Sequence, residues 1–251
     1  MDRTEALDAV RTHPGWYHTL DLGGGVVVEG SVDVRPFVER ALPRSLAGKR
    51  CLDVGTFDGF WAFAMEERGA SSVVGIDVDD TTQLEHPPLK RVGNVATARK
   101  SGIVPGEGFR IAAAARGSAA RRVSCNVYDL DVETLGGSVD FVLVGAILQH
   151  LRDPVKALER VRSVLAPGGC AVLVETVSTR LSLLQPRTPV AEFRPAMPEN
   201  RFTWWVPNLS LLRAWPTAAG MPPVSKVPVL HRPLRGNAKG DWIAAVKVAP
   251  A

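Results

Sequence analysis

Short apolar runs alternate with segments of helical periodicity through the central part of the chain. Four of these runs, at residues 51–54, 72–77, 140–144 and 170–175, have the length and composition of strands in a buried sheet. The segments between them place apolar side chains at intervals of three and four residues, as in helices that pack on a sheet. This alternation predicts an α/β fold with a mostly parallel sheet and helices on both faces.

Residues 1–48 precede the first of these strands and form a predicted N-terminal extension or lid. A helix is expected up to residue 12, before Pro14. Residues 20–28 contain three consecutive glycines followed by three consecutive valines, a pattern typical of a small hairpin or lid strand. Helical spacing returns at residues 36–42.

The remaining residues, 49–251, form the predicted main domain, with an insertion at about 177–208. Five prolines interrupt this insertion, and a run of this length without regular periodicity is usually a functional cover or a small subdomain. Two more apolar runs, at residues 224–230 and 242–248, supply the expected last two strands.

The composition is that of a globular protein with a full hydrophobic core. The chain has 251 residues, of which 45% are hydrophobic, and a net charge of +4 that is spread along the sequence. Such a distribution is typical of solvated helix faces and does not by itself indicate nucleic-acid binding. Residues 1–20 have no continuous apolar run, so no secretory signal and no contact with a membrane are expected, and a cytoplasmic protein is predicted. The three cysteines show no short paired spacing, which favours free thiols over a metal site. Nothing in the sequence indicates an oligomeric state.

A glycine turn follows the first strand of the main domain. Gly55 and Gly59 frame this turn, and a helical pattern begins directly after it. Glycine permits positive φ and a close approach of the backbone to a ligand, and the N–H groups at a helix start point toward that ligand. Asp53, at the end of the strand, suits an amine or a hydroxyl and disfavours a phosphate. We therefore expect Asp53, Gly55, Thr56 and Gly59 to bind a nucleoside that carries a charged tail.

A second acid, Asp77, ends the next strand, eighteen residues after Gly59 (77 − 59). A carboxylate at this position typically accepts hydrogen bonds from ribose hydroxyls. The adjacent Val78 is expected in the same site. The alternative is that Asp53 caps the helix that follows it and that Asp77 ends its strand in a turn.

These segments together resemble the class I S-adenosylmethionine (SAM)-dependent methyltransferases. The resemblance covers residues 49–177 and is carried by residues 53–59, 74–77 and 139–154. It implies a Rossmann-like sheet of seven strands with an antiparallel strand at one edge. It also implies SAM as the methyl donor and S-adenosylhomocysteine as the product.

More narrowly, residues 126–130 and 148–154 resemble the branch that contains the tRNA wobble-uridine carboxymethyltransferases. In the resembled family an acid usually binds the adenine amine at the position of Asn126, whose amide oxygen supplies the same acceptor. Asp129 is a rival for that role. The resemblance also implies that the Val127 N–H contacts the adenine ring, and the small Gly145 allows the backbone to approach the methionine part.

His150 follows the expected strand at residues 140–144, near the expected position of the transferred methyl group. A neutral imidazole suits the removal of a proton from an oxygen or ring-nitrogen nucleophile near pH 7, so His150 is the predicted catalytic base. His18 and His231 are rivals. The alternative is that His150 only bonds a neighbouring loop.

Aromatic and polar residues in two regions are candidates for the substrate site. We expect an aromatic substrate wall or cover there, and the alternative is that the aromatic rings anchor the extension and the insertion to the core. The candidates are Trp16, Tyr17, His18, Gln149, Trp204, Trp205 and Asn208.

The acceptor is predicted from a departure from the resembled branch. There a tyrosine precedes the matching histidine and an arginine follows it, serving the carboxylate of carboxy-SAM, whereas this chain has Gln149 and Leu151. We therefore expect ordinary SAM and methyl transfer to a small molecule, with the hydroxyl of a specialised metabolite as the acceptor. A tRNA-modifying enzyme and a SAM-binding protein without turnover are the alternatives.

Overall fold

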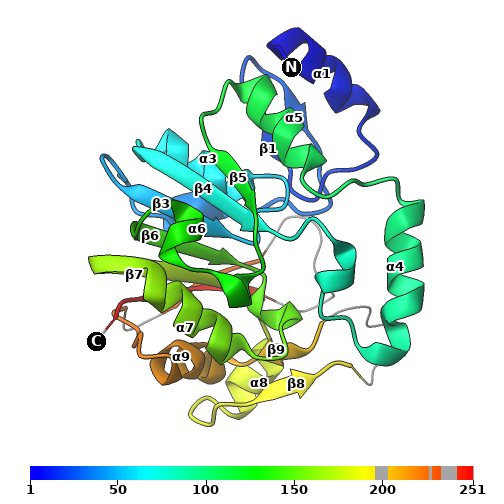
Figure 1. Ribbon diagram of the computed structural model, residues 1–251. Coiled ribbons are helices and arrows are strands. Elements are labelled where there is room, and N and C mark those ends of the chain that lie inside the picture. Colours follow the sequence, from blue (N-terminus) through cyan, green and yellow to red (C-terminus); the bar gives the residue numbers. More distant parts are fainter. Residues whose placement is uncertain (196–202, 226–227, 233–241, 251) are drawn as a thin grey trace.

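The computed structural model describes residues 1–195, 203–225, 228–232 and 242–250. A seven-stranded sheet in the order β10-β11-β7-β6-β3-β4-β5 forms its centre (Figure 1). The predicted mostly parallel α/β fold is therefore confirmed. The strands are β3 (Arg50–Val54), β4 (Ser72–Asp77), β5 (Arg121–Ser124), β6 (Val139–Gly145), β7 (Leu165–Val177), β10 (Val229–His231) and β11 (Trp242–Val248).

Strand β3 lies inside the sheet, between β6 and β4, and pairs in parallel with both neighbours. Its Cys51 lies beside Val73 on β4 and Phe141 on β6. At one edge, β11 runs antiparallel to both β7 and β10, as the family resemblance implied. Because the parallel strands end at the same edge of the sheet, polar residues that follow them converge there.

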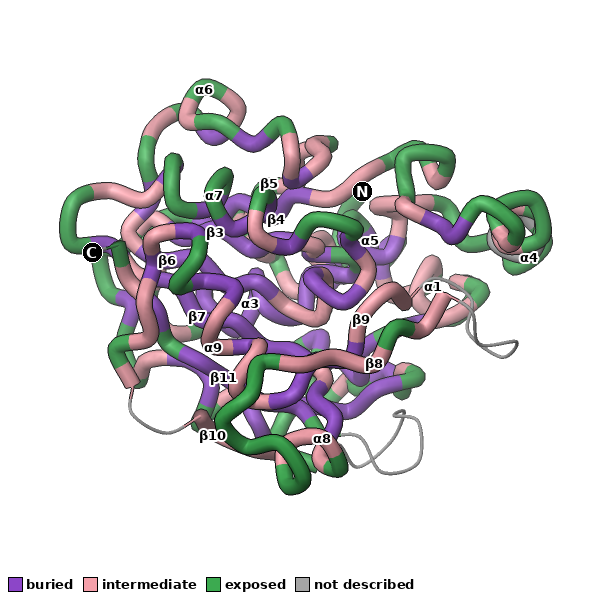
Figure 2. Tube along the Cα trace, turned by 90° about the horizontal axis from the view of Figure 1, so that it is seen from below, coloured by how far each residue is buried: buried purple, intermediate pink, exposed green. Residues whose placement is uncertain are grey.

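Helices cover both faces of the sheet. One hydrophobic cluster includes residues of α3 (Phe60–Glu67), α5 (Glu107–Arg116) and the N-terminal extension. The other includes residues of α7 (Pro154–Val164) and α9 (Leu209–Ala218). Figure 2 shows that the buried residues run through the strands and inner helix faces, whereas the outer turns are exposed.

The N-terminal extension is part of the core on the α3 side of the sheet. Its first helix contacts α5, and its side chains Leu22 and Phe37 are fully buried. The expected helix, hairpin and second helical segment are all present. They are α1 (Arg3–Thr12), β1 (Leu20–Asp21) paired with β2 (Val27–Val28), η1 (Arg35–Phe37) and α2 (Val38–Ala41).

Two further segments leave the sheet. Between β4 and α5 the chain forms η2 (Thr81–Gln83), η3 (Pro88–Lys90) and α4 (Arg91–Lys100), and α4 stands at the side of the molecule (Figure 1). The insertion after β7 contains α8 (Thr179–Leu184) and an antiparallel pair, β8 (Ala191–Phe193) with β9 (Trp205–Pro207). The insertion was expected to lack regular structure, and this expectation is wrong for α8, β8 and β9. Residues 196–202 of the insertion lie outside the described part of the chain.

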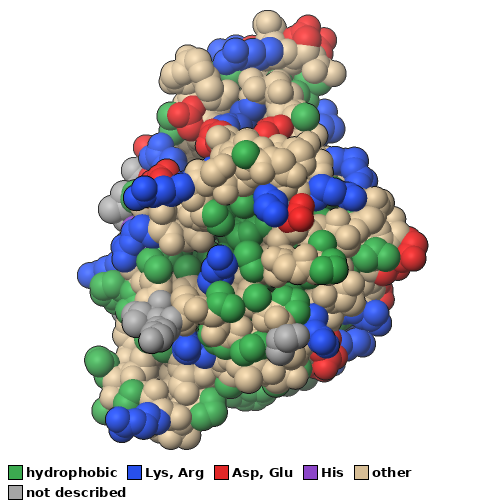
Figure 3. Space-filling model, turned by 90° about the vertical axis from the view of Figure 1, so that its left-hand side faces the viewer, with side chains coloured by type: hydrophobic (Ala, Val, Ile, Leu, Met, Phe, Trp, Pro, Cys, Tyr) green, Lys and Arg blue, Asp and Glu red, His purple; other side chains and the backbone are tan. Residues whose placement is uncertain are grey.

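The basic side chains are dispersed on the face shown in Figure 3. Lysine and arginine groups lie there at separate places from near the top to the bottom, and they do not gather into one patch. In the part of the chain that the structure describes, no helix is both long and apolar enough to cross a bilayer.

Candidate active site

The glycine turn after β3 forms a tight loop whose glycines are required by packing and by backbone conformation. Gly55 and Gly59 have φ of 76° and 90°, in the left-handed region. A Cβ on Gly59 would lie 2.5 Å from the ring of Phe63. The backbone N–H groups of Gly55 and Thr56 donate to the carbonyl of Ile76, at 2.9 and 3.0 Å, and this joins the loop to β4.

Asp53 lies beneath this loop. It is fully buried, and its Oδ2 accepts hydrogen bonds from the Thr56 hydroxyl at 2.7 Å and from the Ala62 N–H at 3.1 Å. Burial raises the pKa of Asp53 to about 7. The Asp53 carboxyl group thus supports the loop and the first turn of α3, no described residue bonds its Oδ1, and a contact with the cofactor remains a prediction.

Asp77, Val78 and Asn126 come together at the adjoining ends of β4 and β5. The Asp77 carboxylate accepts the N–H groups of Phe57 and Val78, at 2.9 and 2.8 Å, and burial raises its pKa. The Cys125 N–H donates to the Asp77 carbonyl at 2.9 Å, which places Asn126 beside it. The Asn126 amide oxygen accepts the Tyr128 N–H at 3.0 Å and caps η4 (Val127–Asp129). Each of these oxygens retains a lone pair for a ligand.

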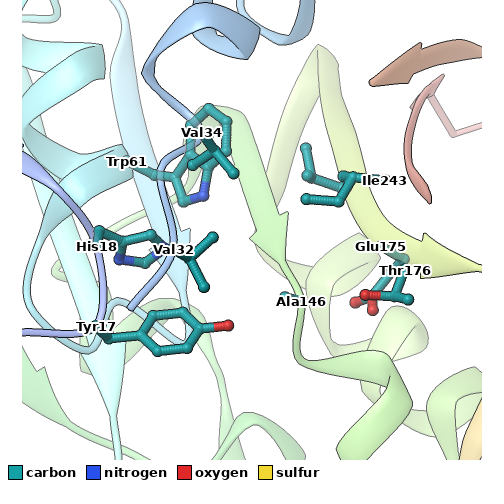
Figure 4. Close-up of a pocket in the computed structure, with 10 residues that line it drawn as sticks. Tyr17, His18, Val32, Val34, Trp61, Ala146, Glu175, Thr176 and Ile243 are labelled. Carbon is teal, nitrogen blue, oxygen red and sulfur yellow. The ribbon is translucent and has the colours of Figure 1, made fainter. Parts of the chain in front are cut away.

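A cavity opens at the carboxyl ends of β6 and β7, beneath residues 17–34 of the extension (Figure 4). Tyr17 reaches across it, with its hydroxyl directed toward the side that carries Ala146, Glu175 and Thr176. Burial raises the pKa of the Tyr17 hydroxyl, and the charges of Asp58 and Glu175 raise it further. The lining residues are Tyr17, His18, Val32, Val34, Trp61, Ala146, Val174, Glu175, Thr176 and Ile243.

The floor of this cavity contains a strained backbone. Ala146 has φ of 53°, which is unusual for a residue with a Cβ. Next to it, Gly145 packs against Trp61, and a Cβ on Gly145 would lie 3.1 Å from the indole ring. The close contact that requires glycine at residue 145 is therefore made by the Trp61 side chain. A contact of Gly145 with the cofactor remains a prediction.

Glu175 is a site residue that sequence reasoning missed. It ends the apolar part of β7 and is buried, and its Oε1 accepts the Leu148 N–H at 2.7 Å. Burial raises the pKa of Glu175 to about 8, which favours the uncharged form near neutral pH. No described residue bonds its Oε2. An acid that closes a buried apolar run was the available signal in the sequence.

Asp58 is the second missed residue. It is buried in the glycine turn, and its Oδ1 lies 2.6 Å from the Nδ1 of His18. Its Oδ2 accepts the backbone N–H groups of Tyr17 and His18, at 3.2 and 2.8 Å. No local pattern indicates this contact, because the partners are forty residues apart along the chain (58 − 18).

His150 follows β6 by a few residues. It ends the short helix η5 (Leu148–His150) and is half-buried, and it is not among the described residues that line the cavity. Its catalytic role remains a prediction, while His18 is the histidine that the fold brings to the cavity. His231 is on β10, where its ring stacks on Phe37 at 5.0 Å.

Trp204, Trp205 and Gln149 hold the insertion to the main domain. The indole N–H of Trp204 donates to the Glu85 carbonyl at 2.5 Å, and that of Trp205 donates to the Leu151 carbonyl at 3.0 Å. The Gln149 carbonyl accepts the Trp204 N–H at 2.8 Å. These contacts favour the alternative of structural anchors over a substrate wall.

Asn208 and Trp16 are also structural. Asn208 is fully buried, and its amide bonds four backbone groups, including the Leu211 N–H that it caps at 2.8 Å. Trp16 is buried in the α3-side cluster with its ring 4.5 Å from that of His13. The expectation that these two side chains bind substrate is therefore corrected. Of the predicted substrate residues, Tyr17 and His18 line the cavity.

Among the described residues, no group of three or more histidines, cysteines or acids is arranged to hold a metal ion. The arrangement that remains is an acid at the end of β4, an amide after β5 and a tight glycine loop, together with the cavity at the ends of β6 and β7. This is the donor and acceptor set of a nucleoside-binding Rossmann-like fold, and it fits SAM better than a pyrophosphate.

Comparison with known proteins defines the family. The family model for the methyltransferase domain matches residues 30–223. Because this match covers most of the chain, the protein belongs to the methyltransferase domain family.

Its relatives include the tRNA U34 carboxymethyltransferase of Methylococcus capsulatus, 33% identical over 70% of this chain and 45% of that protein. The corresponding enzyme of Idiomarina loihiensis is 23% identical over 81% of this chain and 55% of that protein. The chain thus spans about half the length of the curated relatives that it matches.

A solved structure shares the fold over the full length. It is the N-terminal domain of EvdMO1, crystallised in the presence of S-adenosylhomocysteine and D-fucose. The TM-score is 0.61 with 18% identity, and the match covers 100% of this chain and 98% of that one.

Proposed function

We propose that this protein transfers the methyl group of SAM to a hydroxyl of an uncharged small molecule. The observation that carries the proposal is the cavity beneath Tyr17 and His18. Its walls are aliphatic and aromatic, and its polar groups are a phenol, an imidazole, a threonine hydroxyl and a buried acid. None of the described lining residues is a lysine or an arginine, so an anionic acceptor finds no counter-charge there.

The residues at the carboxyl ends of β4 and β5 fit SAM as the methyl donor. Asp77 offers acceptor oxygens to the ribose hydroxyls, and Asn126 with the Val127 N–H offers one acceptor and one donor to adenine. The sulfonium of SAM already carries a good leaving group, so the protein has to align the acceptor, exclude water and remove a proton.

The tRNA U34 carboxymethyltransferases motivate the second candidate function. That reaction uses a donor with an additional carboxylate, for which a cationic partner is expected. Here Leu151 is buried and Gln149 donates its side-chain amide to the Ala146 carbonyl at 3.3 Å, so neither residue supplies a positive charge. The absence of cations among the described lining residues supports ordinary SAM in the same way.

A labelled-methyl experiment separates the candidates. The protein is incubated with SAM labelled in its methyl group and with small-molecule, RNA and protein fractions of an extract from the source organism. Label in a neutral small molecule is the expected result, and base-stable label identifies an ether rather than an ester. Label confined to RNA would overturn the proposal in favour of tRNA. SAM binding by calorimetry without label in any fraction would favour the non-catalytic alternative.

A further inference from the structure

The N-terminal extension and the glycine turn jointly build an aspartate–histidine pair. Asp58, in the turn, holds the segment that carries His18 through three contacts, two to backbone N–H groups and one to the imidazole. Both side chains are buried. The geometry of the pair is therefore fixed by the same turn that the cofactor site uses.

This contact determines which nitrogen of His18 carries the proton. Asp58 is an acceptor, so the Nδ1 at 2.6 Å from its Oδ1 is the protonated nitrogen. In the neutral ring the Nε2 then presents a lone pair, and no described residue bonds it. The ring is also fixed in its plane, because it stacks on Phe60 with centroids 4.9 Å apart and planes 22° apart.

The oriented imidazole lies on the cavity. His18 is one of the residues that line it on the extension side (Figure 4). Ala146 directly follows Gly145 at the carboxyl end of β6. The sequence-predicted base His150 is not among the described lining residues.

We propose that His18 is the general base of the reaction and that Asp58 is its positioning residue. The proposal rests on the function proposed above. An acceptor oxygen attacks the methyl carbon of SAM, the new C–O bond forms, and the C–S bond breaks with its electron pair left on sulfur. The hydroxyl proton passes to the Nε2 of His18, and Asp58 stabilises the imidazolium until that proton leaves to water.

Direct contact with the acceptor makes His18 testable by activity and by spectroscopy. We expect His18→Gln to lower kcat by about 10²–10⁴-fold, the usual contribution of a general base. SAM affinity measured by calorimetry should stay within about 3-fold, because His18 is not in the glycine turn. His13→Gln is the matched control, since His13 is in the same extension but is not among the described lining residues.

Asp58→Asn tests the positioning role. The amide can donate to Nδ1 and favours the opposite tautomer, so we expect kcat to fall by about 10-fold or more although His18 is still present. Long-range ¹H–¹⁵N spectra of the apo-protein should show His18 protonated at Nδ1 in the wild type and at Nε2 in Asp58→Asn. This readout needs no acceptor.

The pH profile gives a further criterion. The titratable groups around His18 are Asp58 and Tyr17 next to it, Asp53 beneath the turn and Glu175 across the cavity. Wild-type kcat should fall at low pH, as expected for a reaction that needs a general base, and His18→Gln should lose this dependence.

All variants are assayed with methyl-labelled SAM and with the neutral small-molecule fraction that accepts label from the wild type. If the wild type labels nothing, the proposed function fails, whereas the tautomer spectra still test the pair. If the wild type is active and His18→Gln retains its rate within about 3-fold with an unchanged pH profile, the role of His18 is overturned. A His18 ring protonated at Nε2 in the wild type would overturn the role of Asp58.

Discussion

At the scale of single residues, Phe57 shows how the glycine turn departs from an all-glycine loop. It has φ of 45°, a region that a residue with a Cβ occupies at a cost. Its N–H donates to Asp77, and its ring contacts the ring of Tyr17 with centroids 5.6 Å apart. Phe57 therefore links Asp77 to the segment that carries Tyr17.

We predict that Phe57→Gly is more stable than Phe57→Ala by about 0.5–1 kcal/mol. Both variants lose the ring contact with Tyr17, so their difference isolates the strain at positive φ. Urea unfolding of the two proteins measures this difference. Equal stability, or a more stable alanine variant, would show that the backbone of residue 57 is not strained in solution.

At the scale of elements, the insertion is held by backbone contacts that converge on one side chain. The Asn208 oxygen accepts from Leu211 and Val190, and its nitrogen donates to the carbonyls of Gln185 and Thr188, both at 2.8 Å. These contacts join α9 to the chain between α8 and β8. One buried amide thus determines how several short elements meet.

Asn208→Ala should lower the free energy of unfolding by about 2–3 kcal/mol, because a helix cap is lost and buried carbonyls lose their donor. Asp131→Ala is the matched comparison. Asp131 caps α6 (Val132–Leu135) through the Thr134 N–H at 2.8 Å, but it is exposed, so its loss should cost clearly less than the loss of Asn208. Urea unfolding gives both values, and a loss at Asn208 no larger than that at Asp131 would contradict the anchoring role.

At the scale of the whole molecule, two buried acids link stability to pH. Burial raises the pKa of Glu175 to about 8 and that of Asp53 to about 7. Between their ordinary pKa values and these raised ones, both carboxyl groups keep their protons in the native state, whereas the unfolded state has already lost them. These groups contribute most stability below about pH 4 and lose it as the pH rises toward about 8.

We predict a lower melting temperature at about pH 8.5 than at about pH 5.5, and a smaller difference in Glu175→Gln, which resembles the protonated acid. Each kcal/mol of unfolding free energy that the variant recovers at the higher pH raises its melting temperature by about 2–4 °C in a domain of this size. Glu159→Gln, on the exposed side of α7, is the control and should leave the difference unchanged. A pH dependence in Glu175→Gln equal to that of the wild type would show that Glu175 is ionised in the native state.

The antiparallel pair at the sheet edge was implied by the family resemblance, and the helix and strands of the insertion were not predicted. The order of the other strands and helices along the chain and the positions of Gly55 and Gly59 were predictable. They depend on local periodicity and on backbone conformations that few residues other than glycine adopt. The family resemblance was visible in the sequence for the same reason, because residues 53–59 and 139–154 are short contiguous motifs. The role of Asp53 was not predictable, because the direction of its side chain depends on how α3 packs on the sheet.

The cavity and its chemistry were decided by tertiary structure. Its walls come from the extension, α3 and the ends of β6, β7 and β11, which meet only when the sheet is assembled. The contact of His18 with Asp58 spans forty residues, and the bond from Leu148 to Glu175 spans twenty-seven. Hydrophobic periodicity determines which elements form, but polar side chains separated this far in sequence find their partners through the packing of those elements.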